Sequence, residues 1–203
     1  MRLAQALVLA LASTMVLHAG VNALILQPTA KDVERALKPA QGREAQRAEF
    51  HQPYIVHPDH PALEQLEAIT EYRRYVMATE EQLRMGNWLF AQSAQRAQEK
   101  LASWRGRLTV AARLRFHPQN TLIGLPPYEL AIANPDLAPL ELTRTPINAM
   151  LSGRRNDLHA PLIGATLEAV FDAAVVGQTA RPVILSLNGQ PVASVIFDFS
   201  KLD

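Results

Sequence analysis

The sequence contains no cysteine, no surplus of either charge and no long polar tract. Without cysteine the chain has no disulfide and no lipid-modified cysteine at its start. The roughly 180 residues that follow residues 1–23 are enough to bury a core without disulfides. The 20 basic residues nearly balance 19 acidic ones, so no net charge draws the protein to nucleic acid or anionic membranes. These features are typical of one or two globular domains.

Several catalytic and cofactor motifs are also missing. The chain has no Walker motif, no G-x-G-x-x-G loop and no G-x-S-x-G elbow. We therefore predict no cofactor and no catalytic residue. Nucleic acid is excluded as a partner, because the helical part offers no basic aromatic platform for it.

Residues 1–23 follow the order of a signal peptide. Met1-Arg2 supplies a positive charge, and Ala6 to Leu17 is an apolar run interrupted by Ser13 and Thr14. Small residues follow at Ala19, Gly20 and Ala23. This order predicts export to the periplasm or medium, with cleavage after Ala23 or after Ala19. The alternative is an inner-membrane anchor, because Leu3 to Leu26 carries no charge.

Residues 24–60 read as a leader of short or extended segments. Thr29 and Asp32 form a capping-box pattern, which predicts a short helix that ends near Pro39. The polar stretch 42–49 is either a solvated helix or a linker. Pro53, Pro58 and Pro61 then favour an extended segment.

Residues 61–105 predict a helical hairpin. Apolar residues recur along one helical stripe, three, four or seven positions apart, at Leu63, Leu66, Ile69, Val76, Leu83, Phe90, Ala94, Ala97, Leu101 and Trp104. Gly86-Asn87 divides the stretch into two helices, 61–85 and 88–104. The stretch RMGNWLFAQSAQRAQEKL (84–101) resembles the turn and second helix of a tetratricopeptide-repeat hairpin, and this resemblance implies two antiparallel helices.

Two charged residues, Arg73 and Glu80, occupy positions where this spacing calls for apolar side chains. We interpret them as members of exposed ion pairs between neighbouring turns, because exposed pairs are far commoner than buried charges. The alternative is a partly buried ion pair or a polar groove.

Residues 106–203 predict a β-rich domain of five or six short strands. Alternating apolar residues mark strands at 108–116 and 163–175, and shorter ones are expected at 128–133 and at 140–143, before Pro146. The runs 183–187 and 192–197 flank Asn188-Gly189, a strong hairpin signal. The predicted fold is α+β: an N-terminal helical hairpin followed by a mostly antiparallel β-sheet or small β-sandwich.

The best candidates for chemistry are three histidines, His51, His57 and His60. With Asp59 they offer ligands for Zn²⁺ or Cu²⁺, but their spacing matches no metal motif and lacks helical i,i+4 geometry. We predict that they bind no metal. His117, at the end of a strand, is a further candidate if Asp136 or Glu129 lies beside it.

A basic surface is the remaining candidate. It comprises Arg105, Arg107, Arg113 and Arg115, with Arg144, Arg154 and Arg155 later in the chain. We interpret it as a solvated strand face with arginines that discourage aggregation. The alternative is a patch that meets phospholipid headgroups or an acidic polymer.

Two classes of function remain. The sequence favours an exported, non-catalytic binding module whose partner is an envelope protein, a polymer or the membrane surface. The alternative is an exported hydrolase or metal-dependent enzyme that uses His51, His57 and His60, or His117.

Overall fold

The computed structural model describes residues 25, 27–133, 136–149 and 160–203. The expected signal peptide and Arg154 and Arg155 lie outside these residues. The helices and strands are α1 (Ala30–Ala40), α2 (Glu44–His51), η1 (Gln52–Tyr54), β1 (Ile55–Val56), β2 (Leu63–Ile69), α3 (Glu71–Arg84), α4 (Ala94–Lys100), η2 (Ala102–Trp104), β3 (Arg107–Arg115), β4 (Tyr128–Ile132), β5 (Glu141–Asn148), β6 (Leu162–Asp172), α5 (Ala173–Val176), β7 (Ala180–Leu187), β8 (Gln190–Asp198) and η3 (Phe199–Lys201). The fold is α+β, as the sequence predicts.

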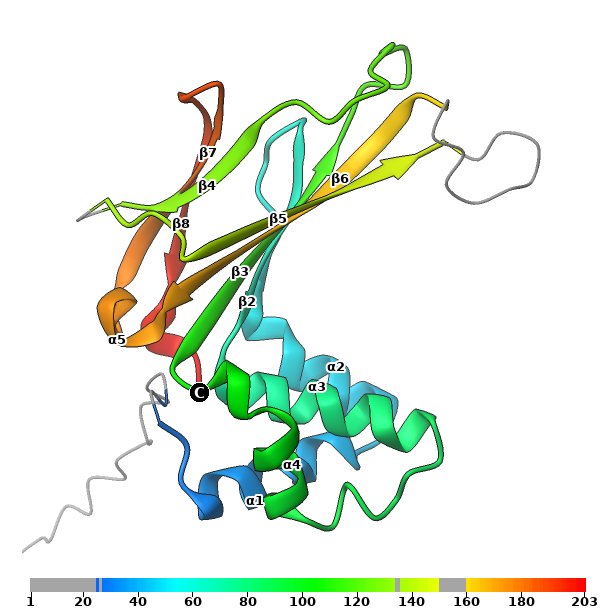
Figure 1. Ribbon diagram of the computed structural model, residues 1–203, viewed down its shortest axis with the longest axis vertical. Helices are drawn as coiled ribbons and strands as arrows, with labels where there is room; N and C mark the ends of the chain where they lie inside the picture. Colours follow the sequence, from blue (N-terminus) through cyan, green and yellow to red (C-terminus); the bar gives the residue numbers. More distant parts are fainter. Residues whose placement is uncertain (1–24, 26, 134–135, 150–159) are drawn as a thin grey trace, which may run out of the picture.

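Two antiparallel sheets form the β part. One has the strand order β1-β2-β3-β6-β5 and the other β4-β7-β8. Alternate residues of both sheets fill one apolar core, which includes Leu108 and Val110 of β3, Leu167 of β6 and Leu185 of β7. Figure 1 shows the sheets above a separate group formed by α1–α4.

Local sequence signals place several elements where they were expected. In α1, Thr29 and Asp32 form the predicted capping box, with the Asp32 N–H 3.3 Å from the Thr29 hydroxyl oxygen. Strands β7 and β8 form the predicted hairpin, and Leu187 pairs with Gln190 across a two-residue turn. Asn188 (φ 52°) and Gly189 (φ 73°) both have positive φ, as a type I′ turn requires.

The expected helix from residue 61 is wrong in its first part, since Leu63–Ile69 is strand β2. A β-bulge between Leu63 and Gln65 shifts the register against β3. Because a bulge adds one residue, Leu63 and Leu66 face the same core although they lie three positions apart. The bulge therefore produces a helix-like spacing in a strand.

The rest of the expected helical hairpin is shorter than predicted. Helix α3 ends at Arg84 and α4 covers only Ala94–Lys100. Their apolar faces join α1 in a second core that includes Val33, Val76 and Phe90.

The predicted end of β5 at Pro146 is also wrong, because β5 continues to Asn148. Strand β5 lies at the edge of its sheet. An edge strand tolerates proline because one side of its backbone forms no ladder hydrogen bonds.

Candidate functional site: a groove between α2 and α3

The three histidines of the leader have separate surroundings. The Nδ1 atom of His57 lies 3.2 Å from the Glu64 carbonyl oxygen, and Nδ1 of His60 accepts a hydrogen bond from the Ala62 N–H. His51 lies at the end of α2 and contacts α3 instead. Among residues 25, 27–133, 136–149 and 160–203, no group of three or more His, Cys, Asp or Glu side chains is arranged to hold a metal ion.

His117 follows β3 and has an exposed ring. Its Nδ1 atom accepts a hydrogen bond from the Gln119 N–H at 3.1 Å. This contact holds the ring against its own loop.

The basic residues of β3 are interleaved with acids from neighbouring strands. Arg107 forms an ion pair with Glu141 of β5 at 2.9 Å, and Arg115 pairs with Glu64 of β2 at the same distance. Arg113 lies 3.7 Å from Glu64. This face therefore carries both signs of charge.

Arg105 lines a cavity of about 440 Å³ beside Glu71 and Tyr75. Both carboxylate oxygens of Glu71 accept internal hydrogen bonds, from the Tyr75 hydroxyl and from the Gly106 N–H. Burial, reinforced by the Glu71 carboxylate, raises the pKa of Tyr75 to about 12. The Glu71–Gly106 hydrogen bond beside this cavity joins α3 to the residue that precedes β3.

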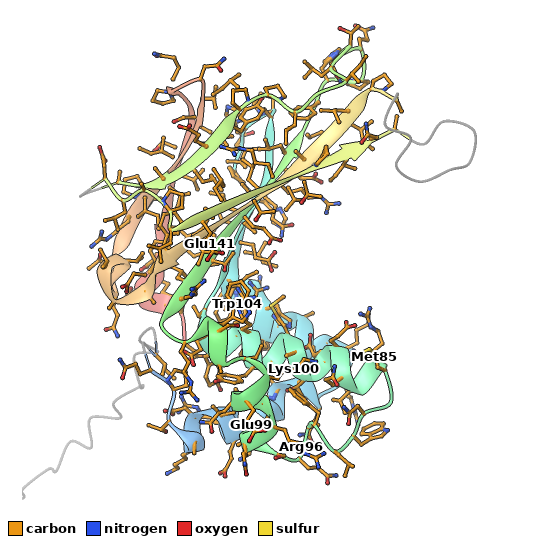
Figure 2. The ribbon with its side chains drawn as sticks, viewed as in Figure 1. Met85, Arg96, Glu99, Lys100, Trp104 and Glu141 are labelled. Carbon is orange, nitrogen blue, oxygen red and sulfur yellow. The ribbon has the colours of Figure 1, made fainter. Side chains whose placement is uncertain are left out.

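Arg74, also on α3, connects the helical group to β3 on another side. Arg74 donates a hydrogen bond to the Thr109 hydroxyl at 2.7 Å, and its guanidinium lies 3.6 Å from the centroid of a Trp104 ring. Figure 2 shows Trp104 at the junction of helices and sheets. Burial lowers the pKa of Arg74 to about 10.

The interpretation of Arg73 as a surface residue is wrong, because its side chain is only 3% exposed. Its guanidinium donates to the Glu67 carboxylate at 2.5 Å and to the Ala68 carbonyl at 2.7 Å. It also lies over the Tyr54 ring, 4.8 Å from the centroid. The alternative of a partly buried ion pair describes this position, because the side chain of the partner Glu67 is 23% exposed.

His51 connects Arg73 to Glu80. Nδ1 of His51 accepts a hydrogen bond from Nε of Arg73 at 3.1 Å. Nε2 lies 3.1 and 3.2 Å from the two Glu80 carboxylate oxygens. Since Nδ1 is the acceptor, the ring's proton is on Nε2 and points at Glu80.

Electrostatics explains why the arrangement contains both acids and a histidine. Burial lowers the pKa of Arg73, and the neighbouring Glu67 carboxylate opposes this shift. A buried cation is stable only when its donors are used and a counter-charge is close. Glu67 supplies the charge and accepts from Nη2, while His51 accepts from Nε and the Ala68 carbonyl from Nη1.

A groove of about 870 Å³ opens beside this network. It is lined by Ala40, Gln41, Arg47, His51, Ile55, Arg73, Met77, Glu80, Glu81, Leu83, Arg84 and Trp88. Helix α2 forms one wall and has no buried residue, and α3 forms the other. The helix periodicity puts residues 73, 77, 80, 81 and 84 on one face of α3.

The groove offers few kinds of functional group. Its described lining contains guanidinium, carboxylate, imidazole and amide groups, but no hydroxyl or thiol. Both nitrogens of its only lining histidine are engaged by Arg73 and Glu80. Such a site can bind and orient a ligand, but it offers no activated Ser, Thr or Cys nucleophile.

One sequence signal pointed to this site. Arg73 and Glu80 interrupt the apolar stripe one heptad apart, which puts them on the same face of α3. Their partners could not be inferred, because Glu67 belongs to a strand that reads as helix and His51 lies 22 residues before Arg73.

Comparison with known proteins found no match. No family model, no curated protein and no solved structure matches the chain. Among the residues that the structure describes, no helix is both long enough and apolar enough to cross a bilayer.

Proposed function

We propose that this protein is an exported, non-catalytic binding module whose ligand lies in the groove between α2 and α3. The signal-peptide pattern of residues 1–23 supports export. The observation that carries the binding function is the groove itself, whose charged wall is fixed by hydrogen bonds within the protein.

A fixed wall favours binding because little side-chain order has to be gained when a ligand arrives. Each guanidinium nitrogen of Arg73 donates a hydrogen bond, His51 is held at both nitrogens, and Arg47 donates to the Gly42 carbonyl at 2.9 Å. Immobilising a long side chain on binding costs about 0.5–1.5 kcal/mol. Here the side chains are already ordered by contacts within the protein, so binding requires less of this loss of entropy.

Enzymatic alternatives have less support. A hydrolase based on His51 requires a free ring nitrogen, and both are in use in the described network. A metal site built from His51, His57 and His60 requires the three rings to converge, whereas each has a different local partner.

Export is tested by mass spectrometry of the protein recovered from its own host. We expect a new N-terminus between residues 20 and 24. An intact chain that begins at Met1 and fractionates with membranes would replace export by anchoring.

Ligand binding in the groove is tested with 1-anilinonaphthalene-8-sulfonate, an anionic fluorescent probe whose aromatic rings bind exposed apolar surface. We expect saturable binding that Trp88→Ala weakens by about tenfold, because Trp88 lines the groove and is 65% exposed. Ile196→Ala is the matched control, since Ile196 is 63% exposed but lies on β8. Equal binding by both variants and the native protein would refute the groove as a binding site.

A further inference from the structure

We propose that the ligand of this groove is an amphipathic α-helix of a partner protein. This inference rests on the proposed binding function and adds the class of ligand. Three features of the groove lead to it: its apolar end, the mixed charges of its rim and the helical nature of both walls.

The apolar end of the groove continues onto an exposed patch. Met85, Trp88 and Leu89 follow α3 within five residues, and they are 60%, 65% and 62% exposed. Trp88 also lines the groove. Figure 2 shows Met85 on the helical group, at the end of α3 away from the sheets. Large apolar side chains this exposed and this close together in the chain are typical of sites of protein association.

The rim of the groove carries both signs of charge. Arg47 of α2 lies 3.9 Å from Glu80, and Glu81 and Arg84 of α3 pair with each other, but the side chains of Arg47, Glu81 and Arg84 remain 40%, 47% and 76% exposed. A ligand with one anionic headgroup would meet Glu80 and Glu81 as well as the arginines. A helix with acidic and basic residues beside an apolar stripe has a complementary partner for each sign.

The walls favour a helix over an extended peptide. Both walls are helices, whose backbone N–H and C=O groups are paired within each helix. An extended peptide could pair only with β1, a two-residue edge strand whose Ile55 lines the groove, so most of its backbone groups would lie unpaired along Met77 and Leu83. A bound helix pairs these groups within itself.

The length of the groove agrees with a short helix. The lining of α3 runs from Arg73 to Arg84, which spans about 16 Å at 1.5 Å per residue. This is about three helical turns, so a helix of about 14 residues covers the groove and reaches Trp88. Helix-in-groove recognition uses apolar anchors at i, i+3, i+4 and i+7 over such a length.

The test uses a fluorescein-labelled peptide of about 14 residues with Leu at these anchor positions, flanked by Glu and Lys. A second peptide of the same composition has its leucines scattered around the helix. By fluorescence anisotropy, we expect the native protein to bind the first peptide at least about tenfold more tightly than the second. Trp88→Ala should remove this preference, and Ile196→Ala should retain it.

A charge reversal provides an independent arm. Arg84→Glu should lower the affinity for a peptide whose flank facing α3 is acidic. It should raise the affinity for a peptide with Lys at those positions. Circular dichroism of the unlabelled peptide should show a gain of helix on binding.

The outcomes separate the ligand class from the binding function. If both peptides bind equally, or neither binds, while Trp88-dependent binding of the sulfonate probe persists, the helix proposal is wrong and the groove serves another ligand. If the probe also fails to depend on Trp88, both proposals are wrong.

Discussion

Replacing Arg73 by methionine tests whether a buried charge organises the groove. Methionine retains an unbranched apolar stem but removes every donor. The Glu67 carboxylate, the Ala68 carbonyl and Nδ1 of His51 each lose the hydrogen bond that they accept from Arg73.

The expected cost follows from these contacts. Hydrogen bonds to charged groups contribute about 1.5–3 kcal/mol each, and burial of the methionine side chain returns about 1.5–3 kcal/mol. Removing one partner of a buried ion pair generally costs about 3–5 kcal/mol, and we expect a loss in this range. For a domain of this size, that corresponds to a melting temperature lower by about 6–20 °C.

The assay is urea unfolding of the purified protein, monitored by circular dichroism. Arg84→Met is the matched control, because Arg84 is also on α3 and pairs with Glu81, yet its side chain is 76% exposed. We expect the control to change the free energy of unfolding by less than about 0.5 kcal/mol. A loss below about 1 kcal/mol for Arg73→Met, or one equal to the control, would refute the burial of this ion pair.

Three further predictions concern the β-hairpin, the pH dependence of stability and the histidines. Gly189→Val should cost about 1–3 kcal/mol, because a β-branched residue disfavours the positive φ of 73°, whereas Gly124→Val, at a position without positive φ, should be nearly neutral; thermal melts compare the two. Tyr75 keeps its proton up to about pH 12 in the folded protein but only to about pH 10 when unfolded. The folded state therefore binds more protons between these values, so stability should fall as pH rises through this window, and less steeply in Tyr75→Phe; urea midpoints measured across the window check the sign. Stoichiometric Zn²⁺ or Cu²⁺ should leave the melting temperature of the native protein and of His57→Ala unchanged; stabilisation of the native protein alone would reveal a metal site.

Local features of the sequence determined a large part of the fold. The Thr29–Asp32 capping box and the Asn188-Gly189 turn each use hydrogen bonds or backbone angles within a few residues, so the sequence alone was enough to place α1 and the β7–β8 hairpin. Alternation of apolar residues likewise located β3 and most of β6, because a strand with one face in a core has a period of two. In β6, however, Ile163 is 49% exposed despite the alternation.

Where the apolar spacing was ambiguous, only the tertiary structure decided between helix and strand. Leu63 and Leu66 satisfy a helix period, but pairing with β3 and the bulge at Leu63–Gln65 make the segment a strand. A register shift depends on the partner strand, which lies more than 40 residues later in the chain. No local pattern contains that information.

The groove could not be predicted from the sequence for the same reason, because its residues come together only in the folded chain. The sequence placed Arg73 and Glu80 on one face of a helix, but the interpretation drawn from it, that both belong to exposed ion pairs, is wrong for Arg73. Glu67 on β2, His51 on α2 and Tyr54 in η1 decide this, since together they supply the counter-charge, the acceptor and the aromatic surface for one guanidinium. A charge can be buried only where such partners converge, and that convergence is a property of the folded chain.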